Sequence, residues 1–207
     1  MTMTTTIRSA LLAAAMAAAL GACASKGQPT AQYDFGPLPA ASANATATAG
    51  AGIGAIIVAD VTGPAALDTE RMHYRLLYAD ARQSRPYAYN QWVSTPAQLV
   101  TQRMKAHIGL AGAKVLSTTD AAASATVLRM ELVDFAQNFD AATSSQGVLS
   151  LRASVFRDHR LLDQKTFTRS APAGSADAAG GARALAEATD AVAAELIAWL
   201  AALPPSK

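Results

Sequence analysis

The stretch that decides the fold is Pro86-Tyr87-Ala88-Tyr89-Asn90-Gln91-Trp92-Val93-Ser94-Thr95-Pro96, because it joins a strand to the start of a long helix. A strand that begins at a proline is typical of a sheet edge, since proline donates no backbone hydrogen bond. Thr95 then precedes Pro96 in the order expected of an N-cap and a first helical residue. Beyond it, apolar residues recur at helical spacing until Gly109 and Gly112 end the helix: Leu99, Val100, Met104, Ile108 and Ala111.

Further strands are predicted on the N-terminal side of this stretch. Residues 53–61 form a nearly continuous β-branched run, which predicts a central strand buried on both faces. Residues 71–78 alternate apolar and polar side chains and predict a half-buried strand. A turn over residues 79–85 would return the chain into the strand that begins at Pro86. Residues 32–37 predict a short first strand.

The C-terminal half predicts an antiparallel meander. A short strand over 115–118 is followed by strands over 126–135, 148–157 and 161–169, and the turn Asp158-His159-Arg160 joins the last two. On the second of these three strands, alternation sends four apolar side chains inward: Leu149, Leu151, Ala153 and Val155.

A second long helix is predicted over about residues 177–202, where Pro204-Pro205 stops it. Its apolar side carries Leu185, Val192, Leu196, Trp199, Leu200 and Leu203, and its opposite side carries Arg183, Glu187 and Asp190. Together these elements predict an α+β fold, a two-layer sandwich. It has a mostly antiparallel sheet with one central helix and one C-terminal helix packed on it.

The N-terminus predicts a lipid anchor. Arg8 precedes an apolar run over 7–20 that is too short to span a bilayer, and Leu20-Gly21-Ala22-Cys23 follows, with the only cysteine of the chain. These features resemble the signal peptide and lipobox of a bacterial lipoprotein. The resemblance implies cleavage of residues 1–22 and acylation of Cys23 on its sulfur and its freed amine. Ala24, where aspartate would signal inner-membrane retention, implies the periplasmic face of the outer membrane of a Gram-negative bacterium.

The expected organisation of the remaining chain is simple. Residues 23–32 form a lipidated tether. Its nine flexible residues, Ala24 to Gln32, have a root-mean-square end-to-end distance of roughly 15–18 Å. Residues 33–203 form a single periplasmic domain. Within it, the Ala/Thr/Ser/Gly-rich residues 38–52 predict a flexible loop.

Several functional classes lack support in the sequence. The formal charge of +2 and the scattered Lys and Arg argue against nucleic-acid binding. The three histidines, His73, His107 and His159, stand far apart without paired carboxylates, so no metal site is expected. No nucleophile can be paired with a base, so we expect no catalytic residues, no cofactor and no enzyme activity.

The candidate binding residues are aromatic. The cluster is Tyr74, Tyr78, Tyr87, Tyr89 and Trp92, and tyrosine and tryptophan are favoured at protein interfaces. Of these, Tyr87, Tyr89 and Trp92 lie on the strand before the central helix and are the candidate partner-binding residues. Cross-strand pairing within a hairpin is the simpler interpretation for most of them. The hypothesis is that the exposed members of this set contact a partner protein.

Four segments in this order, behind a lipobox, resemble the ABC-type transport auxiliary lipoproteins, the family of paraquat-inducible protein C. They are Tyr33-Asp34-Phe35, the run from Ala66 to Arg75, the run from Tyr87 to Pro96, and Glu131-Leu132-Val133-Asp134-Phe135. The spacing from Trp92 to Pro96 is the most specific of these features. The resemblance covers nearly the whole mature chain, and the long loop over 38–52 departs from the family pattern.

The resemblance implies a docking role beside an ABC transporter whose substrate-binding component carries an MCE domain. Such a system would move lipids or other hydrophobic solutes between the inner and outer membranes. Two alternatives remain open, a general envelope-assembly lipoprotein and a carrier that itself encloses an acyl chain. The sequence leaves the cargo, the direction of transport and a homo-oligomeric state undecided.

Overall fold

The computed structural model describes residues 28–39, 52–120 and 126–204. The chain divides into two units, Met1–Thr30 and Ala31–Lys207, and every described helix and strand lies in the second. The predicted signal peptide over 1–22, Cys23, the tether up to residue 27 and most of the predicted loop lie outside the described residues. Among the residues that are described, no helix is both long enough and apolar enough to cross a membrane.

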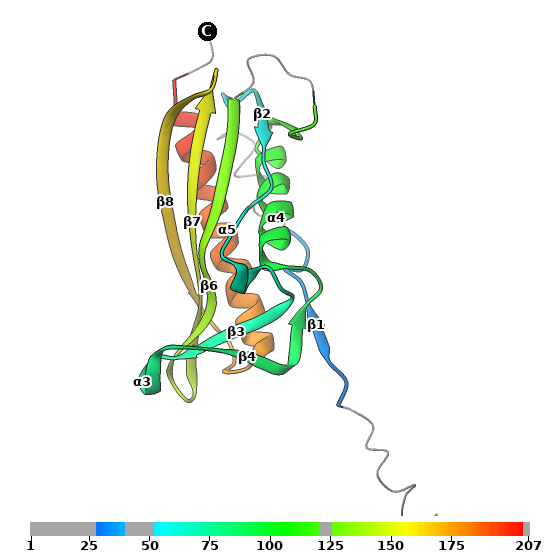
Figure 1. Ribbon diagram of the computed structural model, residues 1–207, viewed down its shortest axis with the longest axis vertical. Coiled ribbons are helices and arrows are strands. Elements are labelled where there is room, and N and C mark those ends of the chain that lie inside the picture. The colour runs from blue at the N-terminus through cyan, green and yellow to red at the C-terminus, as the bar shows by residue number, and fades with distance from the viewer. Residues whose placement is uncertain (1–27, 40–51, 121–125, 205–207) are drawn as a thin grey trace, which may run out of the picture. The chain divides into compact units, whose positions relative to one another are not determined.

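The second unit is an α+β sandwich, as predicted (Figure 1). One sheet contains β1 (Ala31–Tyr33), β2 (Ala55–Val58), β3 (Arg71–Leu76), β4 (Ala81–Trp92), β5 (Lys114–Leu116), β6 (Thr126–Ala141), β7 (Ser144–Arg157) and β8 (Arg160–Pro172). The helices are the short η1 (Ala65–Leu67) and α3 (Leu77–Asp80) and the long α4 (Pro96–Leu110) and α5 (Ala178–Ala202). The predicted central helix and C-terminal helix are therefore both confirmed.

Strand β6 organises the sheet. One of its edges pairs antiparallel with β7, which pairs antiparallel with β8, and this confirms the predicted meander. Its other edge pairs in parallel with β2 near its start and with β3 near its end. The order β1-β4-β3-β6-β2-β5 completes the sheet, so β2 is an inner strand as predicted. The predicted burial on both faces is wrong, because Ile56 and Val58 are buried whereas Ala55 is exposed and Ile57 is half-buried. The parallel pairings of β6 were not predicted, because they join segments more than 60 residues apart.

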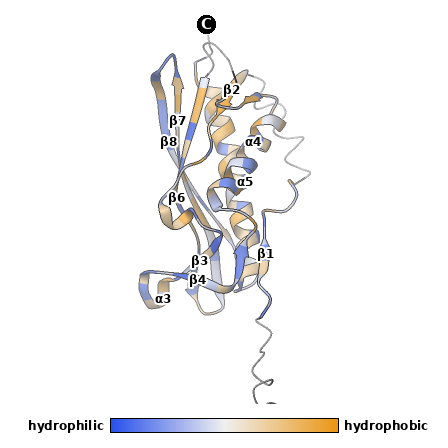
Figure 2. Ribbon diagram, turned by 45° about the vertical axis from the view of Figure 1, so that its right-hand side comes forward, coloured by the Kyte–Doolittle hydropathy of each residue, from blue (hydrophilic) through white to orange (hydrophobic). Residues whose placement is uncertain are grey.

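The core between the sheet and the helices is filled by the residues that alternation and helical spacing predicted. Leu149, Leu151, Ala153 and Val155 of β7 have no exposed surface, and neither do Val192 and Leu196 of α5. Helix α4 buries Val100, Met104 and Ile108 completely. Figure 2 shows the hydrophobic colour concentrated on β6, β7 and the two long helices.

A glycine allows α5 to lie close to the sheet. A Cβ atom on Gly147 of β7 would come within 2.5 Å of the Leu185 backbone nitrogen and 2.7 Å of the Ala184 carbonyl carbon. Real Cβ atoms do not approach backbone atoms so closely, so a side chain here would push the helix away.

The β3–β4 region corrects one prediction. Residues 71–78 do not form one strand followed by a turn over 79–85, because β3 ends at Leu76, α3 follows, and β4 already begins at Ala81. Tyr74 and Arg75 pair with Arg85 and Ser84, which continues the ladder into the predicted turn. We call the segment Arg71–Trp92, which comprises β3, α3 and β4, the arm. It crosses the lower end of the sheet in Figure 1.

Candidate functional site

A buried polar cluster joins the two long helices. The Arg103 side chain of α4 is 7% exposed and pairs with both carboxylate oxygens of Asp190 on α5. The Nε–Oδ1 distance is 2.6 Å and the Nη2–Oδ2 distance is 2.7 Å. Arg103 Nη1 also donates to the backbone carbonyl of Gly36 at 2.9 Å. His107 Nε2 lies 2.7 Å from Asp190 Oδ1, so one carboxylate holds two side chains of α4.

The environment keeps the Asp190 carboxylate charged. Burial by itself would raise the pKa of Asp190, but hydrogen bonds from His107 and Arg103 and the charge of the guanidinium outweigh burial and leave it below its ordinary value. A forked arginine–carboxylate pair fixes the relative positions of its partners, because two parallel hydrogen bonds must be satisfied together. The cluster therefore sets the distance from α4 to α5 and holds the chain at Gly36.

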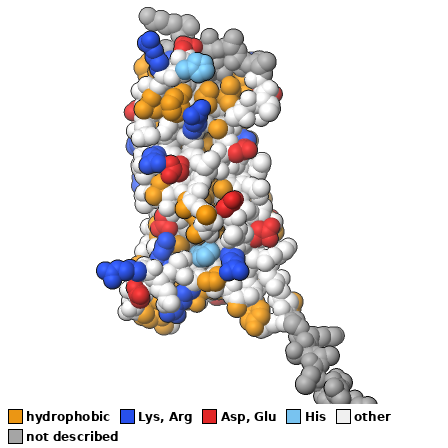
Figure 3. Space-filling model, in the orientation of Figure 1, with side chains coloured by type: hydrophobic (Ala, Val, Ile, Leu, Met, Phe, Trp, Pro, Cys, Tyr) orange, Lys and Arg blue, Asp and Glu red, His pale blue; other side chains and the backbone are white. Residues whose placement is uncertain are grey.

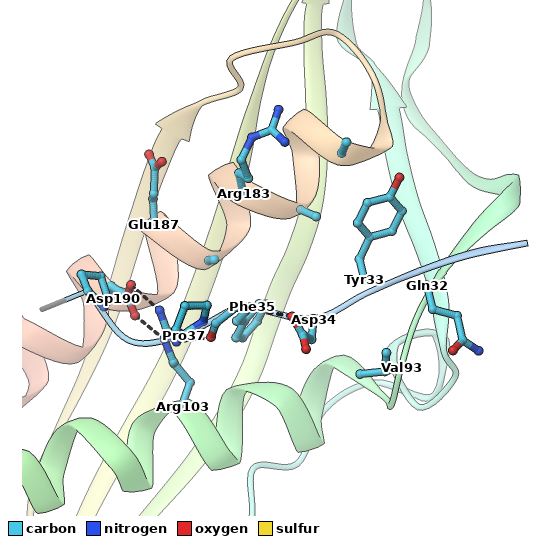
Figure 4. Close-up of a pocket in the computed structure, with 15 residues that line it drawn as sticks. Gln32, Tyr33, Asp34, Phe35, Pro37, Val93, Arg103, Arg183, Glu187 and Asp190 are labelled. Atoms are coloured by element: carbon cyan, nitrogen blue, oxygen red, sulfur yellow. Dashed lines mark hydrogen bonds and ion pairs between the residues drawn. The ribbon is translucent and has the colours of Figure 1, made fainter.

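A groove lies beside this cluster. It has a volume of about 430 Å³ and lies between the end of β1 with the segment that follows it, residues 32–39, and the face of α5 that points away from the sheet. Figure 4 shows Gln32 to Pro37 running between α4 and α5, with the Arg103–Asp190 pair beneath Pro37. The other lining side chains are aromatic or aliphatic, small, or charged: Tyr33, Phe35 and Val93; Ala179, Ala182 and Ala186; and Asp34, Arg183 and Glu187.

The groove presents charged side chains of both signs to solvent. Its walls carry Asp34, Glu187 and Arg183, all of which are exposed, and three alanines make its floor shallow. Charges of both signs and accessible backbone can satisfy the polar groups of a peptide. An acyl chain would leave these charges desolvated without partners, which is unfavourable.

The three aromatic candidates differ in how much of their surface is exposed. Trp92 is 1% exposed and packs against Phe35 and Phe135, with ring centroids 5.8 Å and 5.5 Å away, so it is a core residue and cannot contact a partner from this position. Tyr87 is half-buried and donates to Gln137 Oε1 at 2.9 Å. Tyr89 is 49% exposed and remains the one candidate of this set with an accessible ring.

The Tyr87 side chain connects the arm to β6 of the sandwich through a hydrogen bond. Burial raises its pKa far above the ordinary value, so the phenol stays protonated and donates. Its acceptor, Gln137, is completely buried and donates in turn to Ser145 Oγ and to the Asp177 carbonyl at the start of α5. The Tyr74 ring packs against the Tyr87 ring with a centroid distance of 4.6 Å and an interplanar angle of 44°. Cross-strand pairing, the simpler interpretation of this aromatic set, describes Tyr87 well.

The remaining predicted site residue is Cys23, the proposed lipidation site, and the three histidines were not expected to form a site. Cys23 lies outside the described residues. His73 lies on β3, His107 belongs to the polar cluster, and His159 occupies the β7–β8 turn. Within residues 28–39, 52–120 and 126–204, no group of three or more histidine, cysteine or acidic side chains could hold a metal ion.

Sequence reasoning missed the polar cluster. Asp190 lies on the side of α5 opposite Leu185 and Leu196, as predicted, but its partial burial against Arg103 and His107 of α4 was not predicted. The available signal was spacing, because Arg103 and His107 are four apart and alternate with Val100, Met104 and Ile108 on one face of the helix. A charged residue in such a stripe indicates a buried partner elsewhere in the fold.

Comparison with solved structures finds the same fold at low sequence identity. Protein XCC0632 from Xanthomonas campestris is 18% identical with a TM-score of 0.62, and the match covers 84% of this chain and 92% of that one. An uncharacterized protein is 16% identical with a TM-score of 0.65, and the match covers 82% and 97% of the two chains. A search of curated proteins returned no match.

A family model described as the ABC-type transport auxiliary lipoprotein component matches residues 33–197. The matched range runs from the end of β1 to the last turns of α5, so it includes the groove, the polar cluster and the arm. The chain belongs to the ABC-type transport auxiliary lipoprotein family.

Proposed function

We propose that this protein is a lipid-anchored docking component of an ABC transport system on the periplasmic face of the outer membrane. In this proposal the transporter's substrate-binding component carries an MCE domain, and the system moves lipids or other hydrophobic solutes between the two membranes. The protein works without catalysis. The observation that carries the proposal is the family match over residues 33–197.

We further propose that the groove and the neighbouring Tyr89 bind the MCE-domain component. Tyr89 adjoins the part of β4 that pairs with β1, and the segment that follows β1 forms one wall of the groove. A tyrosine ring supplies apolar contact and a hydroxyl to a partner at low entropic cost. The charged rim would select the partner by charge complementarity.

The rival role, a carrier that encloses an acyl chain, has less support. The layer between the sheet and α5 is occupied by side chains without exposed surface, such as Leu151 and Leu196. The groove, in turn, is open and charged. Native mass spectrometry of the purified protein distinguishes the two roles, because a carrier would retain a stoichiometric lipid and a docking protein would not.

The docking proposal is tested by affinity capture of the MCE-domain component from detergent-solubilised membranes with the full lipidated chain. Tyr89→Ala should reduce the amount captured. The matched control is Leu161→Ala on β8, a side chain of similar exposure at 53%. Equal capture by both variants would remove Tyr89 from the interface.

The groove is tested by placing a photo-activated cross-linking amino acid at position 183, with position 160 in the β7–β8 hairpin as the control. A cross-link to the MCE-domain component from position 183 alone would support the groove. Equal yields from both positions, or from neither, would contradict it.

The lipid anchor is tested with Cys23→Ser. This variant should leave the membrane fraction, because acyl chains contribute about 0.8 kcal/mol for each buried methylene. Retention of the variant after a carbonate wash would contradict the anchor.

A further inference from the structure

The arm concentrates the positive charge of the chain. Residues 71–92 contain four arginines and one aspartate, a formal charge of +3, whereas the whole chain carries +2. The charge of Arg75 is met by Asp134 of β6, with Nη2–Oδ1 at 3.0 Å. Arg71 and Arg82 are exposed and Arg85 is half-buried. Asp80 is the one acidic residue of the arm that could offset their charge. The arm is therefore a basic surface on a chain that is otherwise close to neutral.

The tip of the arm exposes apolar side chains beside these arginines. Leu77 and Tyr78 of α3 are 37% and 53% exposed. Figure 3 shows hydrophobic side chains at the lower left corner with Lys or Arg side chains around them, where Figure 1 places α3. Tyrosine and arginine beside an aliphatic side chain are typical of a membrane interface, where the rings lie at headgroup level and guanidinium groups meet phosphates.

The arm tip lies at the end of the unit where the chain enters it. In Figures 1 and 2, α3 and the start of β1 both lie low, and the last turn of α5 lies high. Only residues 24–30 separate the proposed acylated Cys23 from Ala31, the first residue of β1. Even fully extended, these residues reach only about 25 Å, at 3.3–3.6 Å per residue. A lipid on Cys23 therefore keeps this end of the unit close to the bilayer.

We propose that the arm tip, Leu77 and Tyr78 with Arg82 and Arg85, binds the anionic phospholipid headgroups of the membrane that holds the anchor. This inference rests on the lipid anchor of the proposed function and adds an orientation to it. With the tip on the membrane, the unit is held at two points, and the end that carries the last turn of α5 points into the periplasm.

The size of the tip favours a lipid surface over a second protein. Two apolar side chains on a four-residue helix are far fewer than the twenty or more residues that each side of a stable protein interface supplies. A tethered unit needs much less, because the anchor already holds the tip at a high effective concentration beside the lipid. Headgroup phosphates also complement the charges of Arg82 and Arg85, neither of which forms an ion pair with another described residue.

The test uses the full lipidated chain reconstituted into phosphatidylcholine vesicles with brominated acyl chains, with or without phosphatidylglycerol. Tyr78→Trp places a fluorescent reporter at the tip, and Leu162→Trp, near the start of β8 and 40% exposed in the parent chain, is the matched control. The emission of the parent chain, which has two tryptophans, is subtracted. With phosphatidylglycerol, the Tyr78→Trp reporter should lose intensity and shift to shorter wavelength, and the Leu162→Trp reporter should not.

Charge reversal tests the role of the arginines. Arg82→Glu with Arg85→Glu in the Tyr78→Trp chain should abolish the quenching, because each arginine contributes about fivefold to attraction by an anionic surface. Arg160→Glu with Lys165→Glu, both exposed on β8, should leave it unchanged. High salt should weaken the quenching as charge reversal does.

The outcomes separate this inference from the function on which it rests. A chain that floats with the vesicles but shows equal quenching of the two reporters overturns the arm contact alone. A chain that does not float overturns the anchor and the arm contact together. Quenching that persists after charge reversal overturns recognition of anionic headgroups.

Discussion

The two sides of α5 are held by different interactions. The side toward the sheet buries Leu185, Val192 and Leu196 among the apolar residues of β7 and β8. The side toward the groove presents Ala182, Ala186 and Asp190, and its contact with α4 centres on the Arg103–Asp190 pair. Apolar burial is strong and without direction, whereas a buried ion pair contributes little net stability but demands one geometry.

The two sides of α5 therefore have different structural roles. The sheet side of α5, which buries the larger apolar side chains, is expected to contribute more to the free energy of unfolding than the groove side. The groove side determines where α4 and the segment after β1 lie, and so determines the shape of the groove. Changes on the two sides should therefore have different signatures in stability, pH dependence and partner binding.

The largest effect is expected on the sheet side, from Leu151→Ala. Leu151 has no exposed surface, so the change removes buried methyl groups and leaves a cavity that costs about 2–5 kcal/mol. Urea unfolding followed by circular dichroism measures it, and the loss should not vary with pH. Val133→Ala, at a β6 side chain that is 49% exposed, should cost far less. A similar loss from both variants would contradict this difference in roles.

On the groove side, Asp190→Asn should destabilise the protein by about 3 kcal/mol at neutral pH, because it leaves the buried Arg103 without its counter-charge. Glu187→Gln, one turn earlier on the exposed face, is the control for stability and should leave the free energy of unfolding nearly unchanged. Capture of the MCE-domain component should fall in Asp190→Asn even at temperatures where the variant remains folded. Unchanged capture would show that the groove does not depend on the cluster.

The pH dependence of the stability of Asp190→Asn also tests the role of the groove side. Because the pKa of Asp190 is lowered in the folded state, its contribution to stability is present above the ordinary carboxyl pKa of about 4 and is lost as the pH falls through the folded value. The parent chain should therefore lose stability in acid more steeply than Asp190→Asn. Parallel stability–pH curves for the two chains would indicate that the carboxylate contributes nothing.

A smaller effect is expected from Gly147→Ala, which tests how closely α5 approaches the sheet. The added Cβ would lie 2.5 Å from the Leu185 nitrogen, and relieving that overlap should cost about 1–3 kcal/mol. Gly174→Ala is the control, because nothing lies within 4 Å of its added Cβ. Thermal unfolding of both variants measures the difference, and an unchanged midpoint for Gly147→Ala would show that the helix shifts freely.

The smallest effect is expected at the start of α4. Thr95 accepts a hydrogen bond from the Gln98 backbone N–H, and the Gln98 side chain accepts one from the Thr95 N–H, which together form a capping box. Thr95→Ala should cost about 1 kcal/mol. Thr69→Ala, in an exposed loop, is the control, and equal midpoints in denaturant would show that the cap is dispensable.

Local sequence patterns correctly predicted the helices and strands that depend only on residues close to them in the sequence. The alternation from Leu149 to Val155 predicted β7, and its hairpin with β8 was correctly placed at Asp158-His159, two residues with positive φ angles of 49° and 62°. Thr95-Pro96 and the residues before Pro204 gave the bounds of α4 and α5 to within a residue or two. In these elements, neighbouring residues supply the pattern, the cap and the turn.

Other features depended on residues far away in the sequence. Tyr89 and Trp92 are both aromatic residues of one strand, yet Trp92 is buried because Phe35 and Phe135, which come from distant segments of the chain, pack together against it. The length of β4 followed from its ladder with β3, and the breadth of the sheet from the parallel pairings of β6. The alternation of side chains along a strand assigns each residue to one of two faces of the sheet. It does not identify the distant segment that packs on either face.

The sequence by itself determined the family, the α+β class, the two long helices and the meander, because periodicity, caps and turns act between near neighbours. Only the tertiary structure decided that Arg103, His107 and Asp190 meet, that a groove opens beside them, and that the arm exposes a basic and aromatic tip. The physical reason is that a charged side chain can be buried only where a partner meets it. That partner lies 87 residues away from Arg103 and becomes its neighbour only when the helices pack.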